Sequence, residues 1–129
     1  RMTLSDFIGI PYASRGEAFD GADCYGLAVL YNRHILGKEL PQYSHLYVSA
    51  DDMRDASNAI DQGRENWTRV DEGQEGDVIL FKQMGVVSHV GIFLDGVDFL
   101  HIRAGHASAI EAMDSVSWAN RIEGIMRWQ

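Results

Sequence analysis

The sequence holds a single cysteine, Cys24, in the segment DCYGLAVLYNRHILGKEL. Asp23 is a good N-cap residue, so we expect Cys24 at about the first position of a helix. Backbone N–H groups at a helix start stabilise a thiolate, and they can also stabilise the oxyanion that forms when sulfur attacks an amide carbonyl. A free cysteine is also among the most often buried residue types, so an inert core thiol is the alternative interpretation.

Two histidines could supply the base that a nucleophilic thiol needs. His89 lies in SHVGIFLD and His101 in DFLHIRA, and the Asp-Gly pair between these segments predicts a hairpin of residues 90–94 and 99–102. With a three-residue loop, 95–97, the two histidines become diagonal neighbours on one face of the sheet. A loop of even length would put them on opposite faces. On one face, one imidazole can act as base to the thiol while the other fixes its tautomer.

The remaining sequence predicts an α+β domain, with N-terminal helices packed on a C-terminal antiparallel sheet. Apolar residues at three- and four-residue spacing predict a helix over 24–36, which Gly37 ends, and a second helix over 49–63. From residue 76 onwards, short segments rich in β-branched and aromatic residues predict strands. These segments are GDVILFK, SHVGIFLD, DFLHIRA, SAIEAM and RIEGIMRW.

Length, composition and charge narrow the class of protein. The chain has 129 residues, which suits one folded domain, and its single cysteine excludes an intrachain disulfide framework. The net charge of −8 disfavours nucleic acid or an anionic membrane as a partner. No run of 18 apolar residues suggests a transmembrane helix, and no apolar segment near Arg1 resembles a signal peptide, so we expect none.

Taken in order, these motifs resemble the NlpC-type, papain-like cell-wall cysteine peptidases. The matching segments are DCYGL, GDVILF and SHVGIFLDGVDFLHI, and GIPYASRG matches the family's Pro-Tyr segment. The phage-tail branch is the most similar, through the PY…G…DC…GL opening, the LP with a nearby Tyr after the helix, and the W…RIEGIMRW ending. The resemblance covers roughly residues 9–128 and implies that 1–129 form a single NlpC-type peptidase domain of papain-like fold.

The resemblance also implies an activity. Cys24 would be the nucleophile, His89 the general base and His101 the residue that orients it, because the spacing of the two histidines matches the family's. The family hydrolyses peptide bonds in peptidoglycan stem peptides, most often between γ-D-glutamate and a diamino acid. We therefore expect a peptidoglycan hydrolase with a Cys-His-His triad and no cofactor. Its place would be a phage virion tail acting at the bacterial cell wall or periplasm, with other tail proteins as further partners.

Three more residues would contact the substrate or the oxyanion. Tyr12 would reach toward the cysteine, while Asp23 and Ser88 would bind the peptide end of the substrate. Each also has a plain structural explanation: ring packing for Tyr12, helix capping for Asp23 and a strand start for Ser88. One departure from the family is Tyr25, which follows the cysteine where many members have Ser, so a bulky ring replaces a small polar group there.

Other functions remain open from the residues alone. The domain could be a catalytically silent structural or assembly module of a tail tip, and a thiol-reactive probe would test this because an activated thiolate reacts near neutral pH. The enzyme could instead catalyse acyl transfer or cleave the sugar–peptide amide. A metal site formed by Cys24, His89, His101 and His106 matches no common zinc spacing, so we expect no metal.

Overall fold

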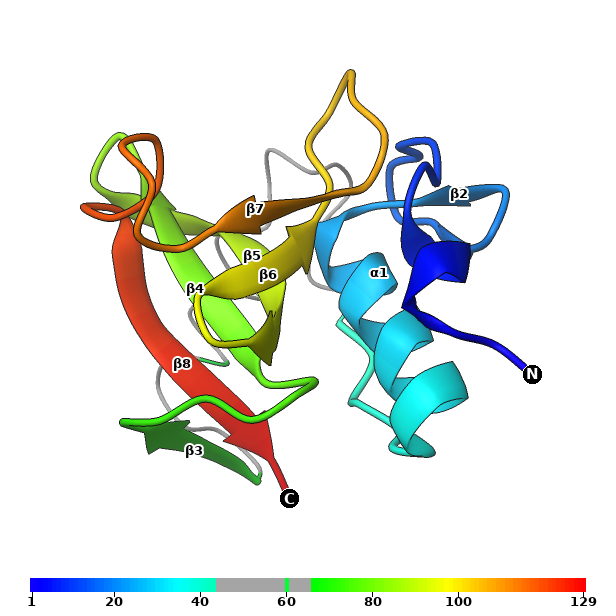
Figure 1. The fold of residues 1–129 in the computed structure, drawn as a ribbon, viewed down its shortest axis with the longest axis horizontal. Coiled ribbons are helices and arrows are strands. Elements are labelled where there is room, and N and C mark those ends of the chain that lie inside the picture. The colour runs from blue at the N-terminus through cyan, green and yellow to red at the C-terminus, as the bar shows by residue number, and fades with distance from the viewer. Residues whose placement is uncertain (44–59, 61–65) are drawn as a thin grey trace.

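The computed structural model describes residues 1–43, 60 and 66–129 (Figure 1). Its main feature is a six-stranded antiparallel sheet with strand order β3-β8-β4-β5-β6-β7. The strands are β3 (Trp67–Val70), β4 (Val78–Gln83), β5 (Val86–Asp95), β6 (Asp98–His101), β7 (Ala109–Ala112) and β8 (Ile122–Trp128). The antiparallel sheet and its five predicted strands are confirmed, whereas β3 was not predicted.

Among the described residues, one α-helix of several turns packs against this sheet. It is α1 (Cys24–Tyr31), which continues into a wider π-helical turn, η2 (Asn32–Leu36), and ends at Gly37 with a left-handed φ of 64°. This confirms the predicted helix over 24–36 and its glycine stop. The second predicted helix, 49–63, lies outside the described residues apart from Ile60. Every residue of α1 is buried, as expected of a helix that is apolar on all sides.

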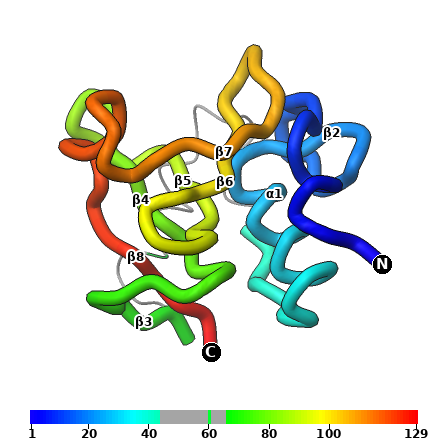
Figure 2. The backbone as a smooth tube through the Cα atoms, in the orientation of Figure 1, coloured from blue at the N-terminus to red at the C-terminus, as the bar shows by residue number. Residues whose placement is uncertain are grey.

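The N-terminal segment covers the side of α1 that faces away from the sheet (Figure 2). It contains a short 3-10 helix, η1 (Leu4–Phe7), and a small hairpin of β1 (Glu17–Ala18) and β2 (Gly21–Ala22). The ring of Phe7 packs on Phe19 and Tyr31, with ring centroids 5.2 and 5.0 Å apart. The helix α1 is thereby held between the sheet and this segment.

The sheet carries a hydrophobic cluster on each of its two faces, because side chains alternate along a strand. The larger cluster packs against α1 and includes Val90 and Ile92 of β5. The smaller cluster is mostly aromatic and includes Phe81, Phe99 and Trp118. A polar residue on this second face is therefore surrounded by rings.

The hairpin between β5 and β6 keeps the predicted register through a different turn. Phe93 pairs with Phe99, but the pairing then shifts so that Asp95 pairs with Asp98. The turn is thus residues 96–97 rather than the predicted 95–97, and Leu94 is the extra residue of a bulge. Because the bulge replaces the third loop residue, the parity on which the predicted histidine pair depends is preserved.

Gly26 lets the loop around Gly16 approach the first turn of α1. A Cβ at Gly26 would lie 1.8 Å from the carbonyl oxygen of Gly16. Helix propensity alone predicts that Gly26→Ala stabilises the protein by about 1 kcal/mol. The clash predicts the opposite sign, a loss of about 3 kcal/mol or more in the free energy of unfolding. Urea unfolding measures which sign holds.

Gly37→Ala is the matched control at the other end of the same helical segment. A Cβ at Gly37 meets nothing within 4 Å, so only the left-handed φ of 64° opposes the substitution. We expect that strain to cost about 1 kcal/mol. If Gly26→Ala is no more destabilising than Gly37→Ala, the close approach of the loop is not what requires glycine at position 26.

Candidate active site

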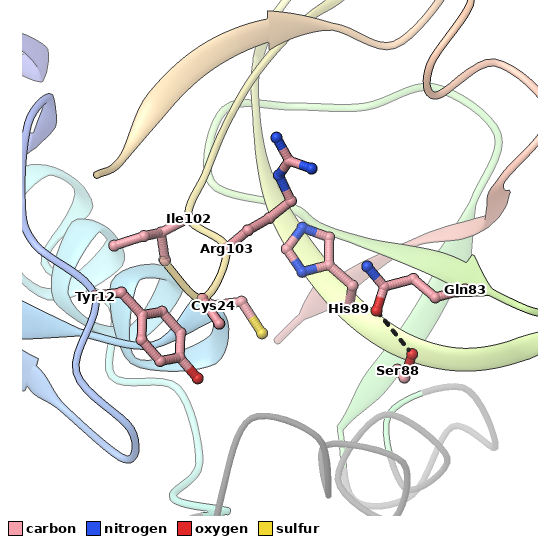
Figure 3. Close-up of a pocket in the computed structure, with 8 residues that line it drawn as sticks. Tyr12, Cys24, Gln83, Ser88, His89, Ile102 and Arg103 are labelled. Atoms are coloured by element: carbon pink, nitrogen blue, oxygen red, sulfur yellow. Dashed lines mark hydrogen bonds between the residues drawn. The ribbon is translucent and has the colours of Figure 1, made fainter. Parts of the chain in front are cut away.

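A pocket of about 210 Å³ opens where the start of α1 meets β4, β5 and the end of β6 (Figure 3). Its lining residues are Tyr12, Cys24, Gln83, Ser88, His89, Ile102, Arg103 and Ala104. Four of the six residues singled out in the sequence therefore line one pocket. Asp23 does not line it, and His101 lies directly behind His89.

Cys24 is the first residue of α1, as predicted. Asp23 caps the helix: one carboxylate oxygen accepts a 2.7 Å hydrogen bond from the backbone N–H of Gly26, and the other accepts a 3.0 Å bond from that of Arg15. Figure 3 shows the Cys24 side chain directed into the pocket between Tyr12 and the ring of His89. Cys24 is only 3% exposed, and it lines this pocket.

The thiol is protonated in the resting protein. Burial raises the pKa of Cys24 to about 12, and the negative charge of Asp23 adds to the increase. Backbone hydrogen bonds with Val90, Tyr25 and Cys24 itself lower the pKa, but they do not outweigh burial. The expectation of thiolate character at the helix start is therefore wrong for the resting state, although these donors would stabilise a thiolate once it forms.

The two histidines form the hydrogen-bonded pair that the hairpin register predicts. Nε2 of His89 lies 2.9 Å from Nδ1 of His101. Nε2 of His101 lies 2.5 Å from Oε2 of Glu111 on the neighbouring strand β7. Because the carboxylate can only accept, neutral His101 carries its proton on Nε2 and accepts at Nδ1 from His89. His89 then carries its own proton on Nε2, which leaves Nδ1 with a free lone pair that can act as a base.

Glu111 is a residue of the site that the sequence interpretation missed. Its second oxygen, Oε1, accepts a 3.0 Å hydrogen bond from the indole N–H of Trp118. Burial alone would raise the pKa of Glu111, but the hydrogen bonds from His101 and Trp118 outweigh burial and lower it. The available sequence signal was an acidic residue in the predicted strand SAIEAM, next to the strand that carries His101.

Aromatic rings enclose the histidine pair and keep it neutral. The centroid of the His89 ring lies 5.6 Å from those of Phe81 and Trp118. Burial lowers the pKa of His89 to about 3, and the electrostatic effects of the neighbouring His101 and of the Arg103 guanidinium lower it further. The pKa of His101 is also lowered, chiefly by burial and against the opposing effect of Glu111. The resting site thus combines a neutral thiol with a neutral imidazole.

The other predicted residues divide between pocket and scaffold. Tyr12 lies in the pocket, where a backbone bridge to Ala22 places it beside β2. Ser88 also lines the pocket, and its hydroxyl donates a 3.2 Å hydrogen bond to Oε1 of Gln83, a residue the sequence interpretation did not single out. Asp23 is fully buried and binds backbone N–H groups, so this structure gives it the capping role and no direct path to a substrate.

Tyr25, the departure after the cysteine, turns away from the pocket. Its ring is buried, and its hydroxyl donates a 2.6 Å hydrogen bond to the carbonyl oxygen of Pro41.

Among the described residues, no group of three or more His, Cys, Asp or Glu side chains could hold a metal ion. No helix among the described residues has the length and hydropathy needed to cross a membrane.

With this geometry in view, comparison with known families identifies the domain. Residues 9–127 match the sequence model of the NlpC/P60 family. The chain belongs to the NlpC/P60 family. The resemblance inferred from the ordered motifs is thereby confirmed at the level of the family, and the papain-like α+β fold agrees with the solved NlpC/P60 structures described below.

Curated relatives of this NlpC/P60 chain are longer proteins. It is 25% identical over 117 residues to the "Murein DD-endopeptidase MepS/Murein LD-carboxypeptidase" of Escherichia coli K12, which covers 91% of this chain and 55% of the relative. It is 24% identical over 115 residues to the "Probable endopeptidase NlpC homolog" of Haemophilus influenzae, covering 89% of this chain and 54% of the relative. The chain thus spans about half the length of the curated relatives it matches.

Solved structures of the family share the fold. An NlpC/P60 family protein from Bacillus cereus superposes with a TM-score of 0.66 at 24% identity, covering 95% of this chain and 36% of that one. A lipoprotein-like NLP/P60 family protein from Staphylococcus aureus gives 0.62 at 28% identity, covering 97% and 39%. The NlpC/p60 domain of the peptidoglycan hydrolase SagA gives 0.61 at 17% identity, covering 95% and 91%.

The burial of His89 makes the stability of this NlpC/P60 domain depend on pH. Below the unfolded-state pKa of 6.5, the unfolded chain takes up a proton that folded His89 does not bind until about pH 3. The free energy of unfolding should therefore fall as the pH drops from 6.5 toward 3, by about 1.4 kcal/mol per pH unit for this one proton. His89→Gln should make the decline shallower by that amount in urea unfolding series.

His34→Gln is the matched control, because His34 is an exposed histidine on η2. Its replacement removes a histidine outside the pocket and should keep the steep decline in the free energy of unfolding that His89 causes. Equal slopes for the wild type and His89→Gln between pH 6.5 and 4 would show that His89 is not held neutral by burial.

Glu111→Gln should reverse the protonation of both histidines. The indole N–H of Trp118 will still need an acceptor, so the amide oxygen should face Trp118 and the amide NH₂ should face Nε2 of His101. His101 then carries its proton on Nδ1, and His89 must accept at Nε2 and carry its proton on Nδ1. Imidazole ¹⁵N chemical shifts at neutral pH report this change, with both protons on Nε2 in the wild type.

Glu123→Gln provides the comparison, since Glu123 pairs with Lys82 and Arg69 on the surface and does not contact the histidines. It should keep the wild-type tautomers. Unchanged imidazole ¹⁵N shifts in Glu111→Gln would mean that Glu111 does not determine where the protons lie.

Proposed function

We propose that this domain is a cysteine endopeptidase that hydrolyses amide bonds in peptidoglycan stem peptides, of the γ-D-glutamyl–diamino acid type. The observation that carries the proposal is one pocket that contains Cys24 at a helix start and His89 with its tautomer fixed by His101. Membership of the NlpC/P60 family supports it, as do relatives described as a murein endopeptidase and a peptidoglycan hydrolase.

In this mechanism the proton moves only when a substrate carbonyl is in place. Nδ1 of His89 takes the proton from Cys24 as the sulfur attacks the amide carbon, so proton transfer and attack are coupled. The backbone N–H groups at the start of α1 would receive the oxyanion, and the Tyr12 side chain lines the same pocket. A resting thiolate is not needed, which agrees with the raised pKa of Cys24.

The second half of the reaction uses the same groups in reverse. The tetrahedral intermediate collapses, the C–N bond breaks, and His89 returns the proton to the departing amine, leaving a thioester on Cys24. A water molecule then gives a proton to His89 and attacks the thioester carbon. The acid product leaves, and the proton returns to the sulfur. His101 and Glu111 hold His89 in one tautomer throughout, and their hydrogen bonds stabilise the transient imidazolium.

We also propose that the domain works as part of a phage tail, where it would act on the cell wall of the host during infection. The support is the similarity of its motifs to the phage-tail branch, including the PY…G…DC…GL opening and the RIEGIMRW ending. Mass spectrometry of purified virions should detect peptides of this chain together with other tail proteins. Their absence from virions while the protein is present in the infected cell would contradict the tail role.

Cys24→Ala should abolish cleavage of purified muropeptides, lowering kcat/KM by at least about 1,000-fold, because the variant removes the single cysteine of the chain and with it the thiol that attacks the amide. The masses of the products identify the bond. Hydrolysis between γ-D-glutamate and the diamino acid is expected, whereas a transferred acyl group or a freed sugar would indicate acyl transfer or cleavage of the sugar–peptide amide.

Glu123→Gln is the control outside the pocket, since Glu123 pairs with Lys82 and Arg69 on the surface and contacts none of the reacting groups. It should stay within about 10-fold of the wild type. Circular dichroism confirms that each variant is folded. Normal cleavage by Cys24→Ala would refute the mechanism. A folded wild type that cleaves no muropeptide would favour the silent assembly module. Slow alkylation of Cys24 at neutral pH would not favour the assembly module, because the thiol of the active enzyme is also protonated at rest.

A further inference from the structure

Arg103 places a positive charge at the candidate active site that the proposed chemistry does not use. It lines the pocket that holds Cys24 and His89, and its side chain is exposed. Figure 3 shows Arg103 next to the His89 ring, with its guanidinium directed away from Cys24. A group bound by this guanidinium would lie beyond His89 rather than at the sulfur.

The guanidinium stacks on a ring and forms no ion pair with the described residues. It lies over the Trp118 ring, 5.7 Å from the ring centroid, which is within the range of a cation–π contact. No carboxylate in the part of the chain that the structure describes forms an ion pair with it. Glu111 is close enough for its pKa to be lowered by Arg103, but both Glu111 oxygens already accept hydrogen bonds from His101 and Trp118.

An unneutralised cation here opposes catalysis. The positive charge of Arg103 lowers the pKa of His89 and of His101, so it works against the imidazolium that must form when Cys24 loses its proton. A bound anion would remove this penalty. The chain as a whole has a net charge of −8, so this cation in the pocket is not part of a generally basic protein.

We propose that Arg103 binds a free carboxylate of the peptide substrate, on one of the two residues that flank the scissile amide. A guanidinium matches a carboxylate with two parallel hydrogen bonds, and stacking on Trp118 orients it for this. Two carboxylates have the required chemistry: the α-carboxylate of a γ-linked D-glutamate and the carboxylate of the following diamino acid. This assignment rests on the proposed function, because it selects among substrates of that same site.

Arg121 offers a matched control. Its guanidinium also lies 5.7 Å from the centroid of the Trp118 ring, and its side chain is exposed. It lines a separate pocket, together with Lys82, Gln83 and Met84, and does not line the pocket of Cys24. Arg121→Gln therefore removes a stacked, exposed cation, as Arg103→Gln does, but it leaves the lining of the pocket that holds Cys24 unchanged.

The experiment measures kcat/KM for three synthetic stem peptides: one with both carboxylates free, one with the D-glutamate carboxylate converted to a carboxamide, and one with the diamino acid carboxylate converted. The wild type should prefer the free form of one carboxylate by about 10-fold. Arg103→Gln should lose that preference, Arg103→Lys should keep part of it, and Arg121→Gln should keep all of it. The peptide whose amidation matters identifies which carboxylate Arg103 binds.

Each outcome decides between the two proposals. If Arg103→Gln cleaves the peptides with the wild-type preference, the assignment of Arg103 is overturned and the proposed function stands. Equal loss of preference in Arg121→Gln also overturns it, because the effect would then come from Trp118 or from general charge. If the wild type cleaves none of the three peptides, the proposed function fails and this assignment fails with it. Arg103→Lys provides the comparison if Arg103→Gln does not fold.

Discussion

The hydrogen bond between Nε2 of His89 and Nδ1 of His101 is the interaction on which the rest of the site depends. It exists only because the register of β5 and β6 puts both rings on one face of the sheet, and a shift of one residue would separate them. The register in turn depends on the bulge at Leu94, which compensates for a two-residue turn. The bulge at the tip of the hairpin is thus required for the hydrogen bond that determines which nitrogen of His89 carries the proton.

From this bond a chain of donors and acceptors extends in both directions. On the side away from the pocket, Glu111 and Trp118 determine which nitrogen of His101 carries a proton, and hence which nitrogen of His89 does. Toward the pocket, His89 presents an unprotonated nitrogen to the side where Cys24 lies (Figure 3). The aromatic cluster around the rings excludes water, which strengthens these hydrogen bonds but also keeps the thiol and the imidazole neutral. Proton transfer from Cys24 to His89 therefore requires a bound substrate, which supplies the favourable interactions that the resting pocket lacks.

Much of this fold was predictable because its signals are local. The helix that begins at Cys24 follows from an N-cap, a 3.6-residue period and a glycine stop, and the hairpin carrying both histidines follows from alternation around an Asp-Gly turn. The sequence left open whether the loop length puts both histidines on one face, and the structure meets that condition through a two-residue turn with a bulge, because neither turn type nor bulge is determined by residue types alone. The short strand β3 was not predicted, because its sequence WTRV shows no distinct alternation of polar and apolar residues.

The parts of the site that the sequence did not predict depend on non-local packing. Glu111 reaches His101 only through the pairing of β7 with β6, and nothing near Glu111 in the chain marks that contact. The protonation state of Cys24 depends on how much solvent the surrounding elements exclude. This burial raises the pKa of the thiol by more than the hydrogen bonds at the helix start lower it. The position of Asp23 in the sequence fits either a helix cap or a substrate ligand. Its complete burial and its hydrogen bonds from backbone N–H groups, which only the structure shows, favour the cap.

The central claim is that the Cys24 sulfur forms a covalent bond to the acyl half of the substrate while His89 moves the proton. The most direct measurement is to quench turnover of a muropeptide in acid and to weigh the proteolytic fragment that contains Cys24. The account predicts that this fragment carries the acyl half of the substrate as a thioester in the wild type and no adduct in His89→Gln. Continued cleavage with no adduct on Cys24, or an adduct on another residue, would contradict it.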